Sequence, residues 1–291
     1  MQGLIIETVS DLYKVEVNDK IYTAKARGKL KKEDIKPYVG DIVNLTECDE
    51  NKLEAVIEKI ENRKNYIKRP KMSNITQLIF VVSSKNPKPD LLMLDKQIAF
   101  AELLKIKPII VLNKIDLDKQ NYFKEIKEVY EKIGYTVIET KATEKVGIKK
   151  LLELMKNNIN AFSGNSGVGK STLINAIFNK DMTIEGEISK KNKRGKNTTT
   201  SVKLYKIDKN TYIADTPGFS TFDISEIESK ELYKYFKEFN DKNCKYIGCT
   251  HIKEEECGIK QDVKDGKIDE GRYERFCKIY DQLKQVEDRK W

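Results

Sequence analysis

Three short stretches decide the fold of this chain: NKID at residues 113–116, GNSGVGKS at residues 164–171 and DTPG at residues 215–218. Each stretch is typical of a loop that binds one part of a nucleotide. In GTPases the phosphate-binding loop ordinarily comes first along the chain and the NKxD loop comes late. The order is rotated here, which predicts a circularly permuted domain whose loops still reach one nucleotide pocket.

The stretch GNSGVGKS is the strongest single motif, because it lies between the apolar residues 159–162 and the helix-forming sequence TLINAIF. Its glycines let successive backbone N–H groups point at phosphate oxygens, and the following helix offers its positive end. Lys170 is expected to reach the β and γ phosphates, and the Ser171 hydroxyl to bind Mg²⁺. The predicted phosphate-binding residues are Gly164, Asn165, Ser166, Gly167, Val168, Gly169, Lys170, Ser171 and Thr172.

The stretch NKID indicates which base is bound. The Asp116 carboxylate can accept hydrogen bonds from the ring N–H and the exocyclic amine of guanine, whereas adenine lacks this pair of donors, so strong selectivity is expected. Asn113 and Lys114 are expected to brace the pocket. The alternative is that NKID only begins a helix, with Asp116 or Asp118 as the capping residue. Ala142, in the sequence ETKAT, stands where GTPases carry an alanine whose backbone N–H meets the guanine oxygen.

The stretch DTPG and the basic run before it are expected to contact Mg²⁺ and the γ phosphate. Asp215 ends the apolar strand TYIAD and is predicted to hold Mg²⁺, while the Gly218 N–H bonds the γ phosphate. Residues 190–200, KKNKRGKNTTT, include Thr199, one of three threonines that can close over Mg²⁺ when GTP is bound; otherwise the run is a flexible basic loop. Phe219 replaces the water-positioning glutamine of many GTPases, so slow intrinsic hydrolysis is expected.

The pattern of apolar and polar residues changes twice along the sequence, and we predict a multidomain α+β chain. Residues 1–62 contain short alternating segments, with Val15 and Val17 between polar neighbours, and predict five strands in a barrel of the oligonucleotide-binding type. Such a barrel binds nucleic acid or serves protein contacts only, and the pattern leaves both open. Residues 63–225 alternate strand and helix and predict the permuted α/β GTPase domain. Residues 226–291 are predicted to form a mainly helical zinc-binding domain.

Periodicity also predicts individual elements within these regions. The basic connector RKNYIKRPK, residues 63–71, is interpreted as a solvated linker rather than a binding site, unless RNA lies nearby. The predicted strands cover residues 78–84 and 135–140, and the predicted helices cover residues 91–104, 122–133 and 148–156. The last helix is expected to use one apolar face for packing, made of Tyr273, Phe276, Cys277, Tyr280 and Leu283.

A second chemical group lies near the end of the chain, where Cys244, Cys249, His251 and Cys257 follow the spacing CxxxxCxHxxxxxC. It contains the only histidine and three of the five cysteines. Three thiolates and one imidazole suit a closed structural zinc site, and in a cytoplasmic protein such grouping favours a metal over disulfides. The alternative is three unrelated thiols and a surface histidine.

Composition limits the remaining classes. The 55 lysines and arginines exceed the 46 acidic residues by 9, which suits a polyanionic partner such as RNA or only keeps the chain in solution. No apolar run approaches the roughly 20 residues that a membrane helix needs, and the first residues lack the pattern of a signal peptide. We therefore expect a cytoplasmic protein without a membrane partner. Separately, we expect a monomer.

Together, the motif order, the barrel-like first region and the Cys, Cys, His, Cys cluster resemble the circularly permuted ribosome small-subunit-dependent GTPase A family. The resemblance extends over essentially the whole chain, including RKNYIKRP before the GTPase domain and GKNTTT in the first switch. It implies an oligonucleotide-binding fold, a permuted GTPase domain and a zinc domain. It also implies a role in late maturation of the small ribosomal subunit, with contact to rRNA and GTP hydrolysis to GDP and phosphate stimulated by the subunit.

One position departs from the family pattern, since the family commonly has histidine before the threonine run and this chain has Asn197. Asparagine can orient a water molecule but cannot transfer a proton at neutral pH, so the water-activating residue is not identified. The candidate catalytic residues are Lys170, Asn197, Thr199 and Gly218.

Two other functions fit part of the sequence. One is a permuted GTPase with a different RNA or protein partner, against which the barrel and the zinc spacing argue. The other is an RNA-binding protein with a weak GTPase domain. Intact nucleotide-binding residues argue against that second function, namely Asp116, Lys170, Ser171 and Asp215.

Overall fold

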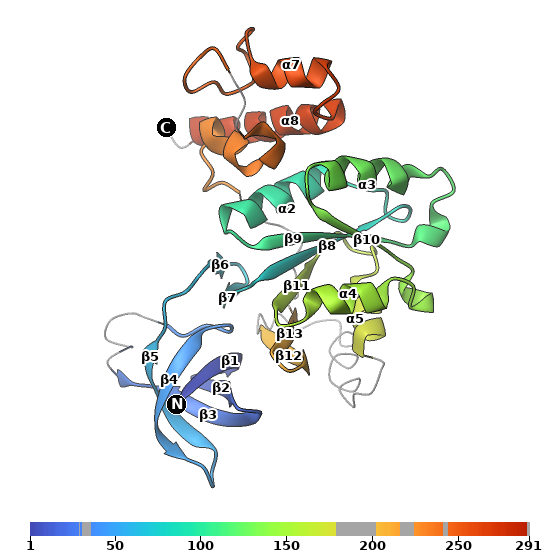
Figure 1. Ribbon diagram of the computed structural model, residues 1–291. Coiled ribbons are helices and arrows are strands. Elements are labelled where there is room, and N and C mark those ends of the chain that lie inside the picture. The colour runs from blue at the N-terminus through green and yellow to red at the C-terminus, as the bar shows by residue number, and fades with distance from the viewer. Residues whose placement is uncertain (29, 31–35, 179–201, 216–223, 241–243, 290–291) are drawn as a thin grey trace. The chain divides into compact units, whose positions relative to one another are not determined.

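The computed structural model describes residues 1–28, 30, 36–178, 202–215, 224–240 and 244–289 (Figure 1). The chain forms two compact units. The first unit contains Met1–Ile79, Ala142–Ser163 and Lys170–Phe219, and the second contains Phe80–Lys141, Gly164–Gly169 and Ser220–Trp291.

The first unit begins with a barrel of five strands. The strands are β1 Gln2–Val9, β2 Leu12–Val17, β3 Lys20–Ala26, β4 Ile42–Asp49 and β5 Glu54–Ile60. They follow the order β1-β2-β3-β5-β4, and β1 also pairs with β4, which closes the barrel. Val15, Val43 and Ile57 are fully buried inside it. Since alternate side chains of a strand face opposite sides, the period-two pattern predicted this barrel correctly.

The connector after the barrel is more ordered than we predicted. Residues 63–71 do not form a solvated linker, because β6 (Tyr66–Lys68) and β7 (Lys71–Ser73) pair as an antiparallel hairpin. Arg63 donates hydrogen bonds of 2.7 and 2.8 Å to the two carboxylate oxygens of Asp41, which is fully buried. A buried carboxylate needs such a partner, and this requirement fixes the connector against the barrel.

The rest of the first unit carries the strand that leads to the phosphate-binding loop. Its elements are the short helix η2 Ala142–Glu144, α4 Ile148–Met155, β11 Ile159–Ser163, α5 Lys170–Phe178, β12 Lys203–Asp208 and β13 Thr211–Asp215. Strand β11 runs parallel to β13, and β12 runs antiparallel to β13.

The barrel contacts this part of the unit at β12. Glu7 of β1 lies opposite Lys203, and the two side chains form an ion pair of 3.3 Å. Further along β12, the Lys206 ammonium donates hydrogen bonds to Glu16 and Asp19 of the barrel.

The second unit contains three strands in the order β10-β9-β8, of which β10 and β9 are parallel (Figure 1). Strand β8 (Gln77–Ser83) enters from the first unit and is buried along its whole length. It is followed by α2 Leu91–Leu103, β9 Lys107–Asn113, the short helix η1 Ile115–Leu117, α3 Tyr122–Lys132 and β10 Thr136–Thr140. Helices α2 and α3 lie on the same side of the strands. The predicted elements agree with these bounds to within one residue at each end.

The C-terminal part of the second unit is mainly helical. Its elements are η3 Ser229–Tyr235, η4 Lys237–Phe239, α7 Gly258–Lys264 and α8 Glu270–Asp288. On α8, Phe276 and Leu283 of the predicted packing face are buried, as is Ile279, whereas Tyr273, Cys277 and Tyr280 are only partly buried. Among the described residues, no helix is both long and apolar enough to cross a membrane.

Candidate nucleotide and metal sites

Asn113 joins the NKID stretch to the phosphate-binding loop. It ends β9, opposite Thr140 of β10, and is 2% exposed. Its side-chain amide donates a hydrogen bond of 2.9 Å to the Val168 carbonyl and accepts one of 2.9 Å from the Thr140 hydroxyl. The protein therefore fixes the phosphate-binding loop against the NKID loop with its own side chain.

Lys114 makes a second connection to the same loop. Its backbone is in the left-handed region, with φ of 64°, and its ammonium group donates bonds of 2.7 Å to the carbonyls of Gly167 and Asn86. The Ser84 hydroxyl in turn donates to the Lys114 carbonyl at 3.1 Å. Residues 84–86 thus support both nucleotide motifs, a contact that the sequence alone did not indicate.

Two glycines of the phosphate-binding loop have no acceptable replacement. Gly164 and Gly169 have φ values of 145° and 99°, which side chains with a Cβ rarely adopt. A Cβ on Gly164 would come within 2.4 Å of the Val81 carbonyl oxygen, and one on Gly169 within 2.3 Å of the Asn113 amide nitrogen. The loop therefore packs too closely on β8 and β9 for any larger residue.

The two aspartates after NKI have different surroundings. Asp118 accepts hydrogen bonds of 3.0 and 2.9 Å from the backbone N–H groups of Tyr122 and Phe123, at the start of α3. Asp116 makes no hydrogen bond within the part of the chain that the structure describes. Asp118, and not Asp116, therefore caps the start of α3.

The remaining predicted contacts lie around α5 and the ends of β11 and β13. Lys170 begins α5 directly after the loop, and burial lowers the pKa of its ammonium group, an effect that a bound phosphate would oppose. Ser166, Ser171 and Thr172 are exposed, Asn165 is partly buried, and Ala142 is buried. Since β11 and β13 are parallel, their carboxyl ends, at Ser163 and Asp215, reach the same edge of the sheet.

Some predicted site residues lie outside the described residues. They are Asn197, Thr199 and Gly218, together with Phe219. For Asp215 the structure describes the strand position only.

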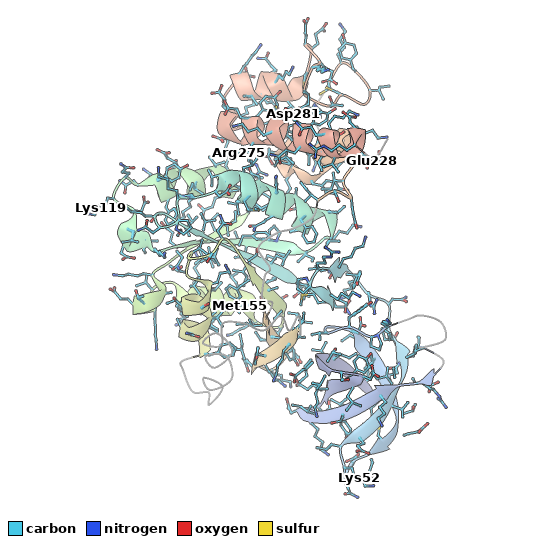
Figure 2. All side chains as sticks on the ribbon, turned by 180° about the vertical axis from the view of Figure 1, so that it is seen from behind. Lys52, Lys119, Met155, Glu228, Arg275 and Asp281 are labelled. Carbon is cyan, nitrogen blue, oxygen red and sulfur yellow. The ribbon has the colours of Figure 1, made fainter. Side chains whose placement is uncertain are left out.

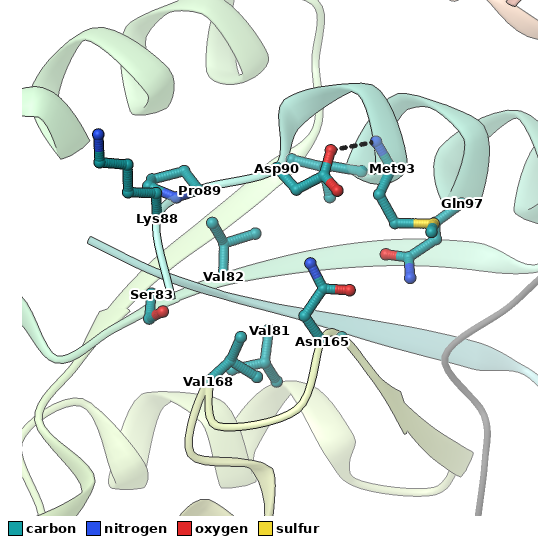
Figure 3. Close-up of a pocket in the computed structure, with 12 residues that line it drawn as sticks. Val81, Val82, Ser83, Lys88, Pro89, Asp90, Met93, Gln97, Asn165 and Val168 are labelled. Atoms are coloured by element: carbon teal, nitrogen blue, oxygen red, sulfur yellow. Dashed lines mark hydrogen bonds between the residues drawn. The ribbon is translucent and has the colours of Figure 1, made fainter. Parts of the chain in front are cut away.

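A cavity of about 20 Å³ lies beside the phosphate-binding loop (Figure 3). Gly164, Asn165 and Val168 line one side of it. The other side is formed by β8 and its following segment with the start of α2, namely Val81, Val82, Ser83, Lys88, Pro89, Asp90, Met93, Leu94 and Gln97. This volume is enough for one water molecule and too small for an organic ligand.

The Cys and His residues form a second site. The ligand atoms of Cys244, Cys249, His251 and Cys257 all lie within 4.8 Å of one another. His251 Nδ1 is 3.6 Å from Cys244 Sγ and 3.3 Å from Cys257 Sγ, and those two sulfurs are 4.0 Å apart. Around a tetrahedral zinc ion, neighbouring ligand atoms lie about 3.5–3.8 Å apart, so the four residues fit the ion.

The protein around this group holds the histidine in place. The Tyr273 hydroxyl of α8 donates a bond of 2.7 Å to the His251 carbonyl, and the rings of Tyr233 and Phe239 pack against the imidazole. Burial raises the pKa of the Cys249 thiol to about 12 and also raises that of Cys257. Without a cation these thiols stay protonated, whereas a bound zinc ion would hold them as thiolates.

Comparison with known proteins places the chain in a family. A family model described as "RsgA GTPase" matches residues 60–225, which is more than half of the chain. A second model, "RsgA N-terminal domain", matches residues 2–57. This chain belongs to the RsgA GTPase family. It is accordingly a GTP-hydrolysing enzyme, and the prediction of a permuted GTPase domain after an N-terminal barrel is confirmed.

Relatives of the RsgA family match the chain over its full length. The small ribosomal subunit biogenesis GTPase RsgA of Clostridium novyi is 39% identical over 295 residues, which cover 100% of both chains. The protein of the same name from Alkaliphilus metalliredigens is 37% identical and covers 97% of this chain and 98% of its own.

Two solved structures show the same RsgA fold. YjeQ from Thermotoga maritima superposes with a TM-score of 0.85 at 36% identity, covering 97% of this chain and 98% of its own. YloQ, described as a circularly permuted GTPase, superposes with a TM-score of 0.82 at 29% identity, covering 98% and 95%.

Proposed function

We propose that this chain is a GTPase of small ribosomal subunit biogenesis, which binds the subunit and its rRNA and whose hydrolysis of GTP the subunit stimulates. The observation that carries the proposal is the direct connection of the NKID stretch to the phosphate-binding loop through Asn113 and Lys114, in the permuted order. The names of the full-length relatives support the choice of partner. We also propose that it acts in the cytoplasm as a monomer, with domain boundaries near residues 62 and 225.

The nucleotide roles follow from where the side chains lie. Asp116 accepts from the guanine edge, because Asp118 and not Asp116 caps α3. Asn113 and Lys114 hold the loop, and the Ala142 N–H meets the guanine oxygen. The residues proposed to surround the phosphates are Gly164, Asn165, Ser166, Gly167, Val168, Gly169, Lys170, Ser171 and Thr172.

Magnesium would be held by Ser171 and Asp215, and would neutralise charge on the β and γ phosphates. Ser171 is exposed at the start of α5, next to Lys170, which supports this assignment. Thr199, Asn197 and the Gly218 N–H are proposed to complete the site around the γ phosphate when the subunit is bound.

The Cys244, Cys249, His251 and Cys257 group is proposed to hold one structural zinc ion per chain. Closed sites with four protein ligands stabilise a fold and leave no open position for a substrate. The close spacing of the four ligand atoms and their contact with α8 support this role.

GTP turnover with and without purified ribosomal subunits tests the proposal. We expect slow turnover of the free chain and stimulation by the small subunit but not by the large one. The stimulation of GTP turnover by the small subunit should fall as the salt concentration rises, because contacts to rRNA phosphates release counterions. A turnover rate that small subunits leave unchanged would contradict the choice of partner while leaving the nucleotide site intact.

A further inference from the structure

Helix α2 presents one face to the phosphate-binding loop. Asp90, Met93, Leu94 and Gln97 line the cavity whose opposite wall is the loop itself (Figure 3). Gln97 is 2% exposed and Leu94 is 1% exposed, so this face is packed against its surroundings. A displacement of α2 would therefore change the cavity wall that faces the loop.

The opposite face of α2 is held by hydrogen bonds and ion pairs to Asp95. Asp95 is fully buried and accepts a hydrogen bond of 2.5 Å from the Tyr130 hydroxyl, one of 2.6 Å from Arg275 and another from Arg272. Each helical residue turns by about 100°, so Asp95 points roughly 160° away from Met93 and Gln97. Figure 2 shows Arg275 on the side of α8 that faces α2.

Arg272 is enclosed as completely as its partner. Its side chain is 1% exposed, and it also forms an ion pair with Glu238. Its guanidinium lies over the rings of Tyr130, Tyr135 and Phe236, 5.2, 5.8 and 4.7 Å from their centroids. This group connects α2 and α3 to α8 and η4 of the C-terminal part.

A buried ionic group of this kind has little effect on stability compared with apolar packing of the same volume. What it adds is a fixed geometry, since each charge must keep its partners. Apolar side chains would allow α2 to slide or rotate against α8, whereas the two arginines hold Asp95 at one point.

We propose that Arg272 and Arg275 are positioning residues of the GTPase: by holding Asp95 they fix α2, and α2 forms the cavity wall that faces the phosphate-binding loop. The inference rests on the proposed function and deepens it. A partner that contacts the C-terminal part acts on nucleotide affinity through this helix.

The experiment compares Arg275→Met with Lys278→Met in the full-length, zinc-loaded chain. Both variants remove one positive charge from α8, but Lys278 is exposed and lies outside the group. We expect Arg275→Met to weaken GDP and GTP binding about threefold to tenfold and to speed hydrogen exchange in Gly164–Gly169. Lys278→Met should change neither quantity, and Arg275→Lys should restore part of the affinity.

A lower melting temperature of Arg275→Met with unchanged nucleotide affinity and loop exchange would overturn the proposal, since the group would then be structural only. If Arg275→Met does not fold, Tyr130→Phe replaces it, because it removes one hydrogen bond to Asp95 and keeps the ring. This variant should weaken binding about twofold, and wild-type affinity would overturn the proposal. Subunit stimulation of the wild type, measured separately, tests the proposed function.

Discussion

The phosphate-binding loop and the Cys/His loop both present ligand atoms from short connections, but they are supported in opposite ways. The side chains of Asn113 and Lys114 hold the phosphate-binding loop by donating hydrogen bonds to its Val168 and Gly167 carbonyls. The Cys/His loop turns its ligand atoms onto one another, and His251 Nε2 is buried without a partner among the described residues. The first loop is thus held by side chains of neighbouring strands and loops, whereas the second gathers four ligand atoms within 4.8 Å of one another, as one shared ion requires.

The largest effect should come from removing the metal. We expect Cys249→Ala to lose zinc and to destabilise the C-terminal part by several kcal/mol, because structural zinc contributes about 10–16 kcal/mol of binding free energy to folding. Elemental analysis measures the zinc content, and thermal melting measures the stability. Cys277→Ala, on α8 outside the group, should keep its zinc. Equal melting of metal-free and zinc-loaded protein would remove the contrast between the two loops.

The second-largest effect should be a change in selectivity for the nucleotide base. Asp116→Asn should reduce the preference for guanine nucleotides by about two orders of magnitude or more and favour xanthine, whose extra carbonyl accepts from an amide. Calorimetric titration with each nucleotide measures the change. Asp118→Asn makes the same change of charge two residues away, and should keep guanine selectivity because an asparagine still caps α3. Selectivity that depends on Asp118 instead would reverse the assignment.

Substitution of two glycines with similar backbone conformations distinguishes the effect of backbone strain from the effect of close packing. Gly169→Ala and Gly134→Ala both place a Cβ at a positive φ, 99° and 97°, which costs about 1–2 kcal/mol. Only Gly169 has a neighbour in the way, the Asn113 amide, while nothing lies within 4 Å of a Cβ on Gly134. We therefore expect both variants to melt at lower temperature and only Gly169→Ala to lose nucleotide affinity, by at least tenfold.

The smallest effect should follow from Thr140→Val, which removes the hydroxyl that donates to Asn113. Loss of one neutral hydrogen bond, about 1 kcal/mol, should weaken GDP binding about fivefold. Thr136→Val, at the start of the same strand, is the control and should bind GDP like the wild type. Equal affinity of both variants would mean that the phosphate-binding loop does not need this support.

The sequence predicted the parts of the fold that depend on local pattern. The alternation of apolar and polar residues predicted the barrel. The three nucleotide-binding motifs and their order predicted the permuted domain, because few other structures need the glycines and lysine of GNSGVGKS and the aspartate of NKID at these spacings. The Cys, Cys, His, Cys spacing predicted a group that the structure brings together.

Contacts between distant segments could not be predicted from pattern. The pairing of Arg63 with Asp41 turned an expected linker into an ordered hairpin, yet both residues look like ordinary surface charges in the sequence. The same holds for Asp95 and Arg272, which are 177 positions apart. Whether a charged side chain is buried depends on which distant element of the chain covers it. The local sequence does not show which element that is.

The contact between β1 and β12 has a consequence for how this chain meets other chains. An uncovered edge strand offers unpaired N–H and C=O groups on which a strand of another protein can add. Here β1 pairs with β12 at one position, Glu7 opposite Lys203, and the ion pairs Lys203–Glu7 and Lys206–Glu16 lie between β12 and the barrel. The protein's own first strand thus pairs with β12 at a position where a strand of another protein would otherwise find an unpaired edge.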